Sequence, residues 1–414
     1  MNSHSVLNPN ELWQVQRPES PRRVTPPSWP LSAAFIALLF FAHVVIAAPE
    51  SCHAADPIVV GDVSSLSGSL QFPESQRAAK LAFESVNVHC GIKGHPVDYQ
   101  VLDDAGEPAK AVALTQELVL QRGAVALVGG TSVVSCGVNA TFYASTPVAS
   151  IPGTGTGPRC FDSPNISPPN SGLFSIVTLA LQFAGEHLSP KKLCLIGNAH
   201  PGIPGNFRDP VERFQRAGGK VATIVNQELQ PHSDPDKALE QLEVAGCDVA
   251  FVGTLGQFAG RLAAALGQTS NRELKLILAP EAYTHEFAAQ LAPALTGRVF
   301  VVTDTDFFDS HKPGMKRARE RLERGGVELS PFAVGGELAA QIMIDALRQI
   351  DGPINRRSVL AALARISPYD TQGLTAAPYK FTWPDSQRFA PGIHVVVLAD
   401  HAWRHATEDW IILK

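Results

Sequence analysis

Short apolar runs alternate along this chain with longer segments in which apolar residues recur every three or four positions. The first such unit predicts a strand at Ile58–Val63, a helix with its apolar face along Ala78–Val86, and a strand at Val97–Leu102. A helix at Pro108–Gln121 and a strand at Val125–Val128 continue the series. Strands separated by about 10–15 helical residues predict a parallel sheet covered on both faces. In such sheets ligands bind beyond the carboxyl ends of the strands.

The alternation continues to a strand at Val148–Ile151, passes a loop rich in Pro, Asn and Ser at 162–171, and then starts again. The later apolar runs predict five more strands, at Leu193–Gly197, Val221–Val225, Val249–Gly253, Leu276–Ala279 and Val299–Val302. A return crossing at Asp304–Asp309 precedes three helices, at Lys312–Arg324, Glu337–Gln349 and Arg356–Ala364. The pattern therefore predicts an α/β protein with two Rossmann-like lobes.

Several short sequence motifs lie at predicted turns and strand ends. They are Gly91-Ile92-Lys93-Gly94, Asp103-Asp104, Leu127-Val128-Gly129-Gly130, Ala279-Pro280-Glu281 and Phe381-Thr382-Trp383-Pro384-Asp385. In their order and spacing, from Pro57 almost to the C-terminus, the chain resembles the type I periplasmic solute-binding proteins of ABC importers, of the leucine/isoleucine/valine-binding kind. The resemblance implies a three-strand hinge between lobe 1 (57–174 and 304–392) and lobe 2 (175–303 and 393–414), with closure around a ligand.

Length and charge agree with this interpretation. The chain has 414 residues, enough for two domains, and a net charge of −5. Nucleic acid is not expected as a partner, because binding it requires a basic face. Hydrophobic residues make up 45% and charged residues 18% of the chain. These proportions are typical of a globular protein.

Residues 1–56 differ from the rest of the chain. Ala33–Ala48 is almost wholly apolar, which is short for a membrane span but suits the core of a secretory signal. We expect a cleaved signal peptide and a periplasmic location, with an uncleaved anchor as the alternative. A lipid anchor at Cys52 is disfavoured, because Pro49-Glu50-Ser51 lacks the small and aliphatic residues that processing requires.

Export permits disulfides among the five cysteines that follow Cys52. Cys136 and Cys160 flank the strand at Val148–Ile151 near its loop end, which predicts a bridge between them. Cys194 and Cys247 lie in apolar strand patterns and are expected as unreactive core residues. An odd number of cysteines predicts at least one free thiol.

The resemblance also implies a binding site. In the family a serine after the third strand and a threonine after the fourth hold a ligand carboxylate, while a glutamate from the second lobe binds the ammonium group. Ser132 or Ser135 follows the third strand here, Thr154 and Thr156 follow the fourth, and Glu281 matches the glutamate. Three alternatives do without a ligand: the serines cap the helix that begins near Ser135, the threonines form a plain turn, and the glutamate is an exposed loop acid.

Four further residues are weaker candidates. Phe72 falls where relatives place an aromatic lid, or else is a core side chain. Ile203 and Leu255 lie near positions where relatives carry tyrosines, which predicts a more apolar pocket. Tyr283, two residues after Glu281, is a possible replacement for one of the lost hydroxyls.

Catalytic motifs do not appear: there is no Gly-x-Ser-x-Gly elbow and no His-Glu-x-x-His. His401 and His405 have the spacing of a helical metal site, but the residues around them predict a terminal hairpin, where that spacing fails. We therefore expect no enzyme, no metal and no cofactor. The predicted function is that of an exported, monomeric solute-binding protein that delivers an amino acid or related amphiphile to an ABC permease. The alternative is a ligand-sensing module of the same fold.

Overall fold

The computed structural model describes residues 55–68, 70–197, 207–220, 222–226, 228–230, 232–254, 257–381 and 391–413. The expected signal segment, Cys52, Ile203 and Leu255 lie outside these ranges. No helix within them has both the length and the apolar character needed to cross a bilayer.

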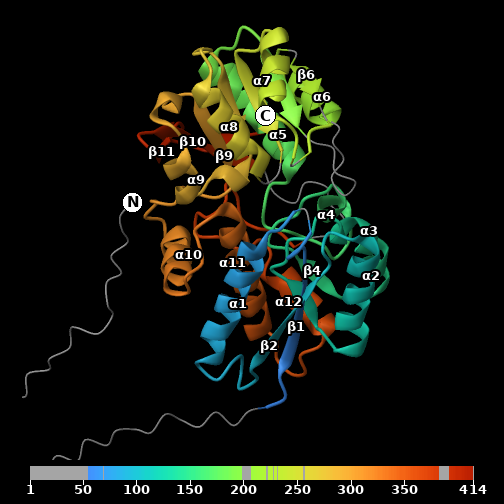
Figure 1. Ribbon diagram of the computed structural model, residues 1–414. Helices are drawn as coiled ribbons and strands as arrows, with labels where there is room; N and C mark the ends of the chain where they lie inside the picture. The colour runs from blue at the N-terminus through green and yellow to red at the C-terminus, as the bar shows by residue number, and fades with distance from the viewer. Residues whose placement is uncertain are drawn as a thin grey trace, which may run out of the picture. The chain divides into compact units, whose positions relative to one another are not determined.

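Two sheets organise the fold (Figure 1). The first is parallel and has the order β2 (Val97–Asp103), β1 (Ile58–Ser64), β3 (Ala126–Val128) and β4 (Ala149–Ile151). The second has a parallel part in the order β9 (Val299–Thr303), β8 (Lys275–Leu278), β7 (Val249–Gly253), β5 (Leu193–Gly197) and β6 (Thr223–Asn226). All the strands predicted from apolar runs are present, with bounds within two residues of the predicted ones. The sequence therefore encodes the α/β fold clearly.

The second sheet also has an antiparallel edge, which the prediction of parallel sheets did not include. β10 (Gly392–Ala399) runs antiparallel to β9 and pairs with β11 (Ala402–His405) and β12 (Ile411–Ile412). His405 lies on β11, so the hairpin expected at the C-terminus is present.

Helices fill the connections between strands. In the first half of the chain they are α1 (Pro73–Asn87), α2 (Pro108–Gln116) with the π-helical turn η1 (Glu117–Gln121), α3 (Ser135–Ser145), α4 (Arg159–Asp162), and α5 (Leu173–Phe183) with η2 (Ala184–Leu188). The next are α6 (Arg208–Arg216), α7 (Pro235–Val244), α8 (Gln257–Gln268), η3 (Pro280–Ala282), α9 (His285–Gln290) and η4 (Pro293–Leu295). The last are α10 (Pro313–Arg324), α11 (Pro331–Arg348) and α12 (Arg356–Ile366).

Helix α11 begins six residues before the predicted start at Glu337, and the extra turns matter for the site. Ser330 caps the helix by accepting a hydrogen bond from the Ala333 amide at 3.1 Å. Gly335 and Gly336, which weaken a helical pattern in sequence, serve close packing here. A Cβ at Gly336 would lie 2.0 Å from the backbone oxygen of Ser75 in α1. Helices α1 and α11 therefore lie side by side (Figure 1).

Two disulfides join pairs of cysteines that both lie in the described part of the chain. Cys136–Cys160 confirms the predicted bridge. Cys194 and Cys247 are buried in the core as expected, but they form a second disulfide, which we did not predict. Cys194 lies on β5 and Cys247 just before β7, and these strands are neighbours in the sheet. Cys90 is disulfide-bonded too, so none of the described cysteines is the free thiol that we expected.

Three chain segments connect the two sheets, and hydrogen bonds join them. The Ser171 amide donates to Oδ2 of Asp304 at 2.8 Å, and the Ser171 hydroxyl donates to the Gly392 carbonyl at 3.4 Å. Ser171 precedes α5, Asp304 follows β9 and Gly392 begins β10. This is the place where the resemblance puts the three-strand hinge.

Candidate ligand-binding site

A cavity lies where loops from the carboxyl ends of strands in both sheets meet the start of α11. Its lining comes from the loop after β4, the segment that leads into α5, the turn after β8, the segment after β9 and the first turns of α11. About 60 Å³ is open to the centre of a water-sized sphere. A single water needs roughly 10–15 Å³, so the cavity has room for several groups of that size.

Glu281 supplies an unpaired acid to this cavity. It follows β8 in the short turn η3, where Pro280 fixes the backbone direction. The residue as a whole is half-buried, yet each carboxylate oxygen exposes less than 1 Å² and accepts no hydrogen bond. Burial raises the pKa of Glu281 to about 8. Such a group is ready to pair with a cation or, when protonated, to donate a hydrogen bond.

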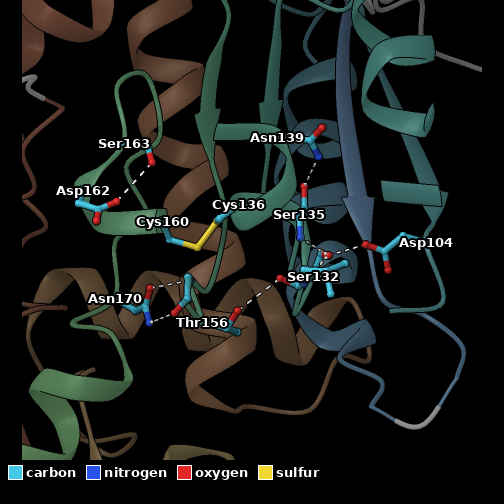
Figure 2. The surroundings of a disulfide bond; sticks show 12 residues. Asp104, Ser132, Ser135, Cys136, Asn139, Thr156, Cys160, Asp162, Ser163 and Asn170 are labelled. Carbon is cyan, nitrogen blue, oxygen red and sulfur yellow. Dashed lines mark hydrogen bonds between the residues drawn. A yellow bond between two sulfur atoms is a disulfide. The ribbon is translucent and has the colours of Figure 1, made fainter. Parts of the chain in front are cut away.

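Thr154 and Thr156 line the same cavity from the loop after β4. The side chain of Asn170 fixes this loop, because it accepts from the Gly155 amide at 2.7 Å and donates to the Gly155 carbonyl at 3.0 Å (Figure 2). Cys160 anchors the same region through its disulfide to Cys136. The two threonine hydroxyls therefore come from a loop held by both covalent and polar contacts.

Ser132 and Ser135 lie in the same lobe but do not line this cavity. The Ser132 hydroxyl donates to a carboxylate oxygen of Asp104 and accepts from the Ser135 amide at 3.0 Å. The hydroxyl of Ser135 accepts from Asn139 Nδ2 at 3.2 Å (Figure 2). Ser132 thus holds the turn that leads into α3, whose N-cap residue is Val134. The backbone oxygen of Ser132 accepts from the hydroxyl of Thr156 at 3.4 Å.

Phe72 lies in an outer groove beside the cavity. Its ring packs edge-on against Phe332, with ring centroids 5.1 Å apart, and Phe332 and Glu281 line both the groove and the inner cavity. Phe72 is thus buried at the boundary between the two spaces.

Tyr283 does not offer its hydroxyl to the cavity. The hydroxyl accepts a hydrogen bond from the Phe308 amide at 3.1 Å, and its ring stacks on that of Phe308. Tyr283 is buried and does not line the cavity, so its hydroxyl does not replace one of the lost hydroxyls there.

Sequence reasoning missed four cavity residues that carry polar side chains, namely Asn170, Asp304, Thr305 and Thr375. Asp304 and Thr305 directly follow β9, so the rule that places ligands beyond strand ends was enough to find them. Thr375 lies in the described segment 367–381 after α12, which contains no helix or strand, and no sequence signal marks it.

A family model described as "Periplasmic binding protein" matches residues 57–401. The chain belongs to the periplasmic binding protein family. No curated protein sequence matches the chain. The family assignment agrees with the observed α/β fold and with the position of the cavity between two sheets.

Solved structures show the same fold at low sequence identity. The substrate-binding protein LivJ from Streptococcus pneumoniae, in complex with isoleucine, is 18% identical with a TM-score of 0.68, over 86% of this chain and 99% of that one. A branched-chain amino acid ABC transporter protein from Thermus thermophilus with bound valine is 16% identical with a TM-score of 0.72, over 86% and 96%. A fatty acid ABC transporter substrate-binding protein from Thermomonospora curvata is 17% identical with a TM-score of 0.70, over 87% and 92%.

Proposed function

We propose that this periplasmic binding protein is the exported solute-binding component of an ABC importer. It holds a small amino acid or a related amphiphilic molecule in the cavity and delivers it to a permease in the inner membrane. One observation carries the proposal: the carboxylate of Glu281 is buried in a cavity without a partner, opposite the hydroxyl-bearing loop of Thr154 and Thr156. The isoleucine and valine complexes of similar proteins support it.

The cavity supplies complementary groups for the parts of such a ligand. Glu281 binds an ammonium group, because a charge-assisted hydrogen bond replaces the contacts that the buried acid lacks. Thr154 donates its hydroxyl hydrogen to a carboxylate or carbonyl oxygen of the ligand, and Thr156 does the same once its 3.4 Å hydrogen bond to the Ser132 carbonyl is released. Apolar side chains of Leu173 and Leu338 form part of the remaining wall and suit an aliphatic body.

Closure of two lobes would complete the site. In this proposal lobe 1 comprises residues 57–174 and 304–392, and lobe 2 comprises 175–303 and 393–414. The cavity takes Thr154 from the first and Glu281 from the second, so a ligand bridges the lobes. Motion about the three connecting segments then closes the protein around its ligand.

Location and partners follow from the same role. The apolar segment Ala33–Ala48 acts as the export signal, and the mature protein acts as a monomer in the periplasm. The ligand leaves chemically unchanged, so the protein acts as a carrier and not as an enzyme.

The test is calorimetric titration of the purified protein with a panel of amino acids and their analogues, with small-angle scattering to follow closure. Glu281→Gln keeps the shape of the side chain and removes its charge. It should weaken the binding of an ammonium-bearing ligand about 30-fold or more, as expected for the loss of a charged hydrogen bond. Glu286→Gln, on the nearby helix α9, is the matched control at an exposed site. Unchanged affinity in the Glu281 variant would contradict the amino-acid function.

A further inference from the structure

Asp304 is a second acid at the cavity, besides Glu281. It directly follows β9, is 5% exposed, and lines the same cavity as Glu281. One carboxylate oxygen, Oδ2, accepts from the Ser171 amide at 2.8 Å. The side chain therefore touches both the ligand space and the hydrogen bonds that join the connecting segments.

The described cavity lining contains acidic side chains but no basic ones. Glu281 and Asp304 are the only ionisable residues in the described lining, which contains no Lys, Arg or His. Burial raises the pKa of both acids, and only backbone hydrogen bonds act in the opposite direction. Neither acid therefore has a basic side chain that compensates its charge.

The outer groove continues this pattern. Its described lining contains the acids Glu74, Glu281 and Glu328, with Arg261 as the one basic residue. Burial raises the pKa of Glu74 and the charge of Glu328 adds to this effect, while a backbone hydrogen bond and the charge of Arg77 act in the opposite direction. Oε2 of Glu74 has no hydrogen-bond partner. The groove and the cavity share Glu281 and Phe332 in their linings, so the acids of the groove favour cations over anions next to the cavity.

We infer that the ligand is an organic cation with an aliphatic body, and that Asp304 is the specificity-determining residue that favours it over a zwitterion. This inference rests on the proposed function and narrows its ligand class. The ammonium group of this ligand pairs with Glu281. The other end of the ligand faces Asp304 and carries either a second nitrogen group or no charge. An ammonium group binds the ionised form of Glu281, and a zwitterion would then bring its carboxylate beside this charge and Asp304 in a described lining that contains no base.

Three ligands of nearly equal size distinguish a preference for a cation from a preference for a zwitterion. Leucine carries a carboxylate, leucinamide a carboxamide and 3-methylbutylamine only hydrogen at the same carbon. Calorimetric titration at pH 7 should show the amide and the amine binding at least about tenfold more tightly than leucine. If leucine binds most tightly, this inference is overturned while the proposed function stands. If a folded protein binds none of the three, nor any other member of the amino-acid panel, both fail.

The variant Asp304→Asn tests the residue itself. The side-chain oxygen of asparagine still accepts from the Ser171 amide, so the connecting segments keep their hydrogen bond while the charge is removed. The preference for leucinamide over leucine should shrink at least about tenfold. Asp309→Asn, on the same segment but exposed, changes the net charge equally and should leave the preference unchanged. Equal weakening of the binding of all three ligands by Asp304→Asn would show that Asp304 has a purely structural role and would overturn the inference. If that variant does not fold, the affinities of the wild-type protein for the three ligands decide the ligand class.

Discussion

The pKa of Glu281 makes ligand binding dependent on pH in a direction that identifies the ligand's chemistry. In the ligand-free protein burial raises this pKa to about 8. At pH 7 the carboxyl group is therefore about 90% protonated. An ammonium group requires the ionised form, so binding must displace the proton. A ligand with an aliphatic amine stays charged up to about pH 9, which leaves the protein as the group that titrates.

The size of the effect follows from this single pKa. The fraction of protein in the ionised form limits the observed affinity, which falls about 100-fold at pH 6, about 10-fold at pH 7 and about 2-fold at pH 8. Affinity should thus rise about 50-fold between pH 6 and pH 8 and level off above pH 9. Asp304 also has a raised pKa and acts in the same direction.

Calorimetry in two buffers of different ionisation enthalpy measures the proton directly. With 3-methylbutylamine at pH 7 it should report release of about 0.9 proton per ligand. The Glu281→Gln variant removes this contribution and leaves only that of Asp304, so the difference between the two proteins belongs to Glu281. Affinity that falls with rising pH would refute the reasoning, because a protonated Glu281 would then be donating to a ligand oxygen.

Two predictions concern the scaffold. Replacing Cys194 and Cys247 by alanine opens a cross-link between residues 53 positions apart and should lower the free energy of unfolding by about 4 kcal/mol; urea denaturation measures it, and a loss below about 1 kcal/mol would contradict it. Gly336→Ala should cost about 3 kcal/mol, because its Cβ would lie 2.0 Å from a backbone oxygen of α1. Gly267→Ala in α8 is the control, since its nearest neighbours lie at 3.5 Å, and it should be neutral or slightly stabilising. Equal effects in thermal unfolding would contradict the packing argument.

The strands could be predicted well because strands buried on both faces are continuous apolar runs. The β5 run Leu193–Gly197, for example, has the same bounds in the sequence pattern and in the structure. The start of α11 was harder, because Gly335 and Gly336 resemble a break until their close contact with α1 is known. The Cys194–Cys247 disulfide was missed for a similar reason, since it depends on the order of strands in the sheet.

The site could be predicted in part. Glu281 and Thr154 follow strand ends, and the position alone brings them to the cavity. The direction of a side chain within a loop is not fixed by position, which is why Ser132 bonds the turn before α3 and Tyr283 lies in the core. Asp304 was seen in sequence only as part of a crossing segment, although it directly follows β9 and the strand-end rule applies to it as well.

Two buried glutamates in this protein show why an unpaired acid indicates a ligand. Glu337 is fully buried on α11, and its Oε1 accepts from Arg321 at 2.5 Å. Glu281 has no such partner, and its pKa of about 8 lies above the ordinary value of 4.5. The folded ligand-free protein therefore binds more protons than the unfolded chain between these values, and its stability falls by up to about 1.4 kcal/mol for each pH unit on rising from 4.5 to 8. Summed over the pH units between these values, this loss is a large part of the roughly 5–15 kcal/mol that stabilises a typical protein. A purely structural acid would gain from a partner of the kind that Glu337 has, whereas a cation bound in the cavity supplies that partner only when the ligand is present.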